Sequence, residues 1–273
     1  MKKWLGYTLL LFALVSLAAG AASAQKKEGG SMDCKDVNGW SDRQQNHCEV
    51  REQTVPAGGT ITVDAGKNGG VSVKGWDRNE VLVRTMVHTF APTQAEAEVL
   101  AKQVRVETAG AQIHAEGPSE VRDFHWSVSF ELFVPRRSDL SLATSNGGIA
   151  ISDVYGKIEF NTKNGGVSLR RIGGNVHGGT TNGGLSIELG GDRWDGEKLD
   201  VETTNGGVSM SVPDNYSAHL ETGTVNGNVN VDFPVTVQGR IAKEISVNLG
   251  SGGATVRAMT TNGGVRLRRS ASN

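Results

Sequence analysis

The sequence predicts an all-β fold, a β-solenoid-like repeat that carries one short helix in its N-terminal part. Three observations lead to this prediction. A six-letter motif recurs about every 20 residues, apolar and polar residues alternate strictly between its copies, and 37 glycines stand beside an aromatic content of only 5%. Alternation with period two is typical of half-buried strands, and self-similarity at a period near 20 is typical of repeat architectures.

The repeated motif is T-x-N-G-[GN]-[IVL], and the threonines of successive copies are 18, 18, 23, 21 and 36 residues apart. The last spacing is twice 18, and Ser251-Gly252-Gly253-Ala254 within it looks like a worn copy. An isolated Asn68-Gly69-Gly70-Val71 stands earlier, without the threonine. Because Asn and Gly adopt positive φ with least strain, we expect them to turn the chain at structural corners. These corner residues are Asn146, Gly147, Asn164, Gly165, Asn182, Gly183, Asn205, Gly206, Asn226, Gly227, Asn262 and Gly263.

Two architectures satisfy this pattern. Consecutive Asn-Gly hairpins would make a meander or a β-sandwich, whereas identical units stacked in register would make a β-solenoid. A hairpin needs only Asn-Gly, but in-register stacking would align the Thr and Asn side chains of every copy in ladders, which explains why the Thr recurs. The regular 18-residue spacing therefore favours the solenoid, with the sandwich or meander as the alternative.

The beginning of the chain is typical of an exported protein. Residues 1–24 combine two lysines, an apolar run and a small-residue Ala-Ser-Ala end, which predicts a secretory signal peptide. No second apolar run follows, so we expect no integral membrane segment after cleavage, and a periplasmic or extracellular location. The mature chain has 26 Lys and Arg against 29 Asp and Glu. This weakly acidic balance argues against nucleic acid as a partner.

The mature chain divides into four parts. Residues 25–49 contain Cys34 and Cys48, for which an exported protein favours one disulfide; a metal site or reactive thiol is the alternative, weakly supported by the neighbouring His47. Residues 50–139 have the pattern of strands with a helix at about 93–104, N-capped by Thr93, and are expected to cap the array. The repeat array then covers residues 140–269, and residues 270–273 form a tail.

The glycine-rich stretches lack the features of known binding loops. The G-x-x-x-x-G-K-[ST] spacing and the following helix of a phosphate cradle are both missing. Ile, Val or Leu stands after the glycines, where a calcium-binding β-roll has Asp. The six histidines show no H-x-x-x-H or H-E-x-x-H pairing, and the sequence contains no nucleophile elbow. We therefore expect no cofactor, no metal site and no catalytic residue.

The spacing of 23 between two copies indicates an inserted loop, Leu-Gly-Gly-Asp-Arg-Trp-Asp-Gly-Glu-Lys. Insertions in solenoids gather on faces that can bind partners, and a Trp beside acids and an Arg suits a sugar ring. Asp192, Arg193, Trp194 and Asp195 are thus candidate ligand contacts. A second hypothesis places a carbohydrate-active enzyme, a lyase or glycosidase on a β-helix, at the acids of Asp192–Asp200.

A lead-in Leu132-Phe-Val-Pro135, the Thr-x-Asn-Gly copies and a late Gly250-Ser-Gly-Gly253 together resemble the bacterial putative adhesin family of β-strand-repeat proteins, a domain of unknown function. The resemblance covers roughly residues 50–269 and implies a right-handed β-solenoid-like structure with no family catalytic residues. The leading hypothesis is a non-enzymatic protein of the bacterial cell envelope, an adhesin or interaction scaffold whose partner is an unknown protein or glycan of the envelope or a host surface. A structural or regulatory envelope component is the third hypothesis.

Overall fold

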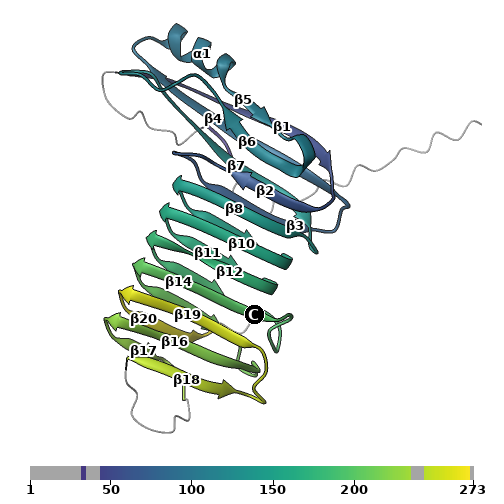
Figure 1. Cartoon of the computed structure of the whole chain (residues 1–273), viewed down its shortest axis with the longest axis vertical. Coiled ribbons are helices and arrows are strands. Elements are labelled where there is room, and N and C mark those ends of the chain that lie inside the picture. Colours follow the sequence, from purple (N-terminus) through teal and green to yellow (C-terminus); the bar gives the residue numbers. More distant parts are fainter. Residues whose placement is uncertain (1–31, 35–43, 235–242, 271–273) are drawn as a thin grey trace, which may run out of the picture. The chain divides into compact units, whose positions relative to one another are not determined.

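The computed structural model describes residues 32–34, 44–234 and 243–270. In this part the chain forms two ten-stranded sheets, A and B, that share one hydrophobic core (Figure 1). One α-helix, α1 (Gln94–Gln103), and a short 3-10 turn, Ala109–Ala111, accompany the strands. The prediction of an all-β, solenoid-like repeat with one short helix is confirmed. The predicted signal peptide, residues 1–24, and the last three residues of the tail lie outside the described residues.

Each sheet contains an array of short parallel strands; sheet A has antiparallel strands at one end and sheet B has an antiparallel pair at each end. In spatial order, sheet A contains β1 (Gln45–Pro56), β4 (Glu80–Ala91), β7 (His125–Pro135), β3 (Val71–Trp76), β9 (Ile149–Ser152), β11 (Val167–Arg170), β13 (Leu185–Glu188), β15 (Val208–Val212), β20 (Val265–Arg269) and β17 (Val229–Val231). Sheet B contains β18 (Glu244–Leu249), β16 (Ala218–Asn226), β19 (Thr255–Asn262), β14 (Lys198–Asn205), β12 (Gly173–Asn182), β10 (Tyr155–Asn164), β8 (Asp139–Asn146), β2 (Thr60–Asp64), β6 (Gln112–Glu116) and β5 (Arg105–Glu107).

The motif copies stack in register and do not form hairpins. Each copy links a strand of sheet B to a strand of sheet A, and these two strands form one rung of the array. Each strand pairs in parallel with the equivalent strand of the next rung. Thr162, for example, lies opposite both Thr144 and Thr180. A meander would require antiparallel pairing between neighbours, so the array is solenoid-like. The right-handed sense of its coil stays a prediction.

Seven asparagines form a side-chain ladder along the exposed corner. Six of them donate a side-chain Nδ2–H to Oδ1 of the neighbouring asparagine at 2.7–3.1 Å, and Asn68 at the end of the ladder accepts only. The isolated Asn68 belongs to this ladder, so β2 and β3 form its first rung. The spatial order is Asn68, Asn146, Asn164, Asn182, Asn205, Asn262 and Asn226.

The threonines of the motif are buried beside the ladder and bind backbone. Thr162 Oγ1 donates to the carbonyl oxygen of Gly147 at 2.8 Å, and Thr180 Oγ1 donates to that of Gly165 at 2.8 Å. Each hydroxyl thus satisfies a carbonyl of the adjacent rung. The predicted alignment of threonines is present, but the contact that fixes them is to glycine carbonyls and not to one another.

The corner glycines are required for a different reason from the predicted one. None of them has positive φ. A Cβ at Gly165 would instead collide with the carbonyl oxygen of Gly147 in the adjacent rung, and the equivalent collision recurs at each copy. Glycine is needed because the backbones of successive rungs approach too closely for any side chain. The glycines concerned are Gly147, Gly165, Gly183, Gly206, Gly227 and Gly263.

Positive φ occurs at the opposite corners of the array, at residues that are not glycine. Asp153 has φ 58° and Arg171 has φ 48°. The Arg171 guanidinium binds both carboxylate oxygens of Asp153 at 2.8 Å and Glu188 Oε1 at 3.0 Å. The ion pairs therefore link the corners of three successive rungs where the backbone conformation is least favourable.

The gap of 36 residues does not contain a worn rung. β19, from the last copy of the motif, pairs in parallel with β14 on one side and with β16 on the other, so this copy lies between two earlier ones. Between β17 and β19 the chain forms β18, which pairs antiparallel with β16 at the edge of sheet B. Ser251-Gly252-Gly253-Ala254 is the connection between β18 and β19, not a copy of the corner.

The other end of the array carries the longer antiparallel strands and the helix. β4 pairs antiparallel with both β1 and β7. α1 begins after Thr93, whose side chain and Glu96 form a reciprocal capping box. Its buried residues Ala97, Leu100 and Ala101 face the core next to β4 and β1. In Figure 1, α1 covers this end of the strands.

Candidate functional site

The predicted ligand-contact loop is tied to the array. Trp194 is 5% exposed and belongs to the core, and its indole Nε1 donates to the carbonyl oxygen of Gly174 at 3.0 Å. The backbone NH of Gly174 donates to the carbonyl of Asp195, and that of Ser217 to the carbonyl of Asp192, both at 2.7 Å. The Trp194 ring is therefore not presented to solvent as a platform on which a sugar ring would stack.

Asp192 and Arg193 form the exposed part of the loop. The Arg193 guanidinium donates to Asp192 Oδ1 at 3.2 Å, and this hydrogen bond lowers the pKa of Asp192. Asp200, the last acid of the enzyme hypothesis, lies on β14 and accepts from Arg257 at 2.6 Å. A hollow of about 340 Å³ beside the loop is lined by Tyr155, Ile172, Gly190, Gly191, Asp192, Arg193, Trp194 and Asp195.

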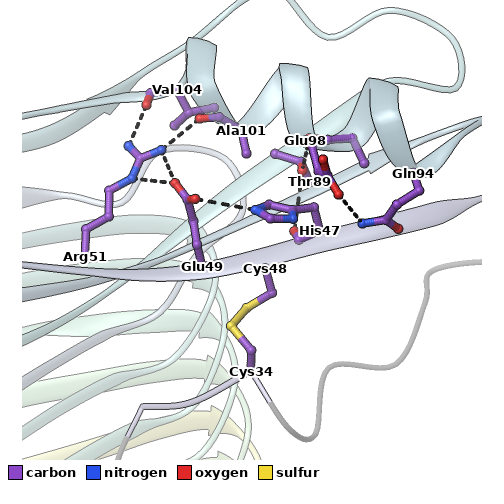
Figure 2. Close-up of polar contacts among 11 residues, drawn as sticks. Cys34, His47, Cys48, Glu49, Arg51, Thr89, Gln94, Glu98, Ala101 and Val104 are labelled. Carbon is purple, nitrogen blue, oxygen red and sulfur yellow. Dashed lines mark hydrogen bonds and ion pairs between the residues drawn. A yellow bond between two sulfur atoms is a disulfide. The ribbon is translucent and has the colours of Figure 1, made fainter.

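The predicted disulfide joins Cys34 to Cys48 on β1, with an S–S distance of 2.00 Å. Figure 2 shows it on one side of β1, while His47, Glu49 and Arg51 lie on the side that faces α1. The bond fixes the end of the N-terminal segment to the edge strand of sheet A. It leaves no free thiol at these two positions, so a reactive thiol here is excluded.

His88 lies opposite Cys48 in the pairing of β4 with β1. Its side chain is buried, and its Nε2 has no hydrogen-bond partner among the described residues. Burial, together with the nearby charge of His47, lowers the pKa of His88. The imidazole of His88 packs against the ring of Phe90, and the two ring centroids are 4.1 Å apart.

His47, Glu49 and Arg51 form a polar cluster on the side of β1 opposite the disulfide, and this cluster contacts α1 (Figure 2). Arg51 donates to the carbonyl oxygens of Val104 at 2.7 Å and Ala101 at 2.8 Å (Figure 2). These are carbonyls of the last helical turn and the C-cap, where a cation is favourable. Glu49 orients Arg51 by accepting from its Nε at 2.7 Å, and His47 Nε2 lies 3.4 Å from the other Glu49 oxygen. These hydrogen bonds attach the C-terminal end of α1 to β1.

The outer face of sheet A is a shallow strip of small side chains. A groove of about 790 Å³ runs over six neighbouring strands, including β7 with Ser129 and Phe130, and Met32 also lines it. Glycines and hydroxyls provide little charge with which to orient a ligand. The outward residues of β3, β9, β11, β13 and β15 along this groove are Ser72, Ala150, Ser168, Ser186 and Ser209.

The outer face of sheet B carries a more polar hollow of about 410 Å³. It lies over Gly179 of β12, which is opposite Asn161 of β10 and Glu202 of β14. Because Gly179 has no side chain, the side chains of the flanking strands form the walls. Glu159 and His177, which are also opposite each other, complete one side. The hollow therefore offers carboxylate, amide, imidazole and hydroxyl groups within one small area.

This hollow was not evident from the sequence because its residues come from four strands, β8, β10, β12 and β14. Asn161 and Glu202 lie 16 and 25 residues from His177 in the sequence. The informative feature is Gly178-Gly179 inside a strand, since glycine in a strand interior often marks close approach or a ligand. A Cβ at Gly178 would collide with the backbone carbonyl oxygen of Phe160, and a Cβ at Gly179 with that of Glu202, so close approach of the neighbouring strands requires both glycines.

Within the described residues, no group of three or more His, Cys, Asp and Glu side chains is arranged to hold a metal ion. No helix in this part of the chain has the length and apolar character that a membrane crossing needs.

A known protein family and several solved structures are similar to this chain. A family model described as Toastrack DUF4097 matches residues 37–268. Among solved structures, a putative cell adhesion protein from Clostridium sporogenes is similar at 11% identity and a TM-score of 0.44, over 82% of this chain and 100% of that chain. A putative adhesin from Bacteroides fragilis is similar at 9% identity and a TM-score of 0.33, over 81% of this chain and 97% of that chain. No curated protein matches the sequence.

Proposed function

The chain belongs to the Toastrack DUF4097 family, and on this premise we propose that it is an exported, non-enzymatic protein that binds a glycan of the bacterial envelope or of a host surface. The observation that carries the proposal is the polar hollow on the outer face of sheet B. Asn161 and Glu202 lie on either side of Gly179 and form two walls of the hollow. Glu159 and His177 line it next to them.

The chemistry of the hollow suits sugar hydroxyls. Carboxylates accept hydrogen bonds, the Asn161 amide both donates and accepts, and the hydroxyls of Thr181 and Thr204 do the same. Strands of a sheet are about 4.8 Å apart, so equivalent outward positions form regular rows across the array. An extended polymer lying across the strands would meet such rows repeatedly, whereas a small ligand would use only the hollow.

Binding is favoured over cleavage by the positions of the acids. Asp192 is paired with Arg193 and Asp200 with Arg257, and the indole that would hold a sugar beside them is buried. Glycoside cleavage needs two carboxyl groups facing each other across the scissile bond. The disulfide between Cys34 and Cys48 supports the exported location, because such bonds persist in oxidising compartments.

The test is a binding assay with the mature chain, residues 25–273. It would be co-sedimented with insoluble envelope polysaccharide and screened against soluble glycans, with isothermal titration of each hit. We expect saturable binding that Glu202→Gln and Asn161→Ala weaken about tenfold or more, since each removes hydrogen bonds to the sugar. Glu244→Gln, on the outward face of edge strand β18, is the matched control and should bind as wild type. Glycan turnover, or equal effects of all three variants, would refute the proposal.

A further inference from the structure

The corner glycines donate their backbone N–H groups along the asparagine ladder in one direction. Gly165 donates to the carbonyl oxygen of Asn182 at 3.0 Å, and Gly206 donates to that of Asn262 at 3.0 Å. The opposite side of each glycine packs against the preceding rung, where a Cβ at Gly206 would meet the carbonyl oxygen of Gly183. Each corner therefore needs a following rung to provide an acceptor for its glycine N–H.

The last rung of the ladder, which contains Asn226 and Gly227, has no following rung. A Cβ at Gly227 would meet the carbonyl oxygen of Gly263, so the packed side of Gly227 faces the array. By the same geometry its N–H points away from the array, and it makes no backbone hydrogen bond among the described residues. The antiparallel strand β18 pairs with β16 only as far as Gly223 and so ends before this corner.

The side chain of Asn226 is also held by fewer hydrogen bonds than the others. In the interior of the ladder, Asn205 donates to Asn182 and accepts from Asn262. The exposed Asn226 donates to Asn262 at 2.8 Å, and its Oδ1 accepts from no group in the described ranges. Among the seven Asn-Gly corners of the ladder, this is the one in which both the asparagine Oδ1 and the glycine N–H lack a partner there.

These two neighbouring groups are the reactants of asparagine deamidation. The backbone nitrogen of the following residue attacks the side-chain Cγ. The N–Cγ bond forms, the Cγ–Nδ2 bond breaks, and the amino group leaves as ammonia with the proton that the backbone nitrogen gives up. Solvent water then opens the cyclic imide at one of its two carbonyl groups and gives aspartate or isoaspartate. Glycine obstructs the attack least, because it has no Cβ.

We propose that Asn226 is a site of spontaneous deamidation and that the ladder protects the other six asparagines. The protection comes from hydrogen bonds that must break before the ring can close. At Asn205 these are two ladder bonds and the N–H bond of Gly206, whereas at Asn226 only the bond to Asn262 must break. Each additional hydrogen bond changes an equilibrium about two- to tenfold, so two of them should slow the reaction about tenfold or more.

The modification changes the end of the array. Aspartate at position 226 has an oxygen in place of the Nδ2–H that donates to Asn262 Oδ1, so the last ladder bond is lost. Isoaspartate also carries the main chain through the side-chain methylene, which lengthens the corner that leads into β17 and disturbs the pairing of β17 with β20. This site is independent of the hollow on sheet B and of any glycan that binds there.

The test incubates the mature chain, residues 25–273, in mildly alkaline buffer and follows it by peptide mapping. Fragment-ion mass spectra assign the conversion to aspartate or isoaspartate at each ladder position. In the folded protein Asn226 should convert at least about tenfold faster than Asn182, Asn205 and Asn262. In concentrated urea the ladder is absent, and the four positions should convert at similar rates.

Two variants separate the end of the ladder from its interior. Asn226→Ala removes the proposed site and the hydrogen bond to Asn262 Oδ1, so Asn262 should convert faster than in wild type. Asn205→Ala is the matched control, because it removes an interior asparagine and leaves the bond between Asn226 and Asn262 in place. The rate at Asn226 should then be unchanged. Melting temperatures establish that both variants are folded.

Two results would overturn the inference. The first is a folded protein in which Asn226 converts no faster than Asn205, or does not convert at all. The second is a faster conversion of Asn226 that persists to the same extent in urea, because the local sequence and not the end of the ladder would then select the site. Both results come from the wild-type chain, so neither depends on the stability of a variant.

Discussion

Asn262 donates its side-chain Nδ2–H to Oδ1 of Asn205 at 2.8 Å, although 57 residues separate them in the sequence. Asn226 in turn donates to Asn262 at 2.8 Å. The last copy of the motif therefore lies between two copies that precede it. The ladder joins the rungs in their spatial order, which differs here from their order in the chain.

The position of an asparagine in this ladder predicts the cost of its removal. Asn205 both donates to Asn182 and accepts from Asn262, whereas Asn226 makes one ladder bond in the described part of the chain. With about 0.5–1.5 kcal/mol per hydrogen bond, Asn205→Ala should destabilise the protein about twice as much as Asn226→Ala. Urea unfolding of the two variants measures the difference. Equal free energies of unfolding would show that the side-chain ladder does not stabilise the array.

Replacing one or the other of the two glycines of a corner by alanine should change the stability of the protein by very different amounts. A Cβ at Gly165 would collide with the carbonyl oxygen of Gly147, while a Cβ at Gly166 would lie 3.6 Å from that of Gly184, an ordinary contact. Neither glycine has positive φ, so conformation alone permits alanine at both. We expect Gly165→Ala to cost about 3 kcal/mol or more and Gly166→Ala to stay within about 1 kcal/mol of wild type. Thermal unfolding that ranks them the other way would contradict the close-approach explanation.

The repeat was predictable from the sequence because the Thr, Asn and Gly of each copy contact the neighbouring copy. The same residue types are therefore needed in every copy. Thr162 binds a glycine carbonyl, Asn164 extends the ladder and Gly165 admits the adjacent backbone. The reason for the glycine was not predictable, since positive φ and close approach select the same residue. Only the backbone geometry separates the two explanations.

The spatial order of the two last copies of the motif could not be predicted either, because their sequences are alike. The copies that contain Asn226 and Asn262 carry nearly the same letters, so either would stack on Asn205. What decides between them is that β18 pairs antiparallel with β16 and so occupies the outer position. The sheet-B hollow was missed because it depends on which residues of β10 and β14 lie opposite Gly179.

His88 should make stability depend on pH. Its pKa in the folded protein is lowered by burial and by His47, while the unfolded chain has the ordinary value of about 6.5. Below that pH the unfolded state binds a proton more readily than the folded state does, so stability falls as the pH drops below about 6.5 and is constant with respect to this group above it. Urea midpoints between pH 8 and 5 measure this slope for wild type.

The variant His88→Leu isolates the contribution of His88. It should flatten the slope of stability between pH 6.5 and 5. The pKa of Glu49 is lowered because hydrogen bonds from Arg51 and His47 together outweigh its burial, so its contribution is lost only below about pH 4.5. A slope that persists in His88→Leu would show that another group causes the pH dependence.

The disulfide should stabilise the N-terminal end. Cys34 and Cys48 are 14 residues apart, and closing a loop of this length is worth about 3 kcal/mol on the chain-entropy model. The double variant Cys34→Ser/Cys48→Ser should therefore melt at a lower temperature than wild type, and dithiothreitol should lower the melting temperature of wild type but not that of the variant. An identical melting temperature for wild type with and without the reductant would contradict this expectation.

Trp194 provides the sharpest distinction between a core residue and a ligand contact. Its side chain is buried and its Nε1 binds the carbonyl oxygen of Gly174, so Trp194→Ala should cost about 3–5 kcal/mol through the cavity and the lost hydrogen bond. Asp192→Asn, in the exposed part of the same loop, should unfold at nearly the same urea concentration as wild type. If Trp194 instead held a sugar, Trp194→Ala would abolish glycan binding while unfolding at the same urea concentration as wild type. Measuring unfolding and binding on the same preparations decides between the two, because a buried indole and a stacking platform predict opposite patterns.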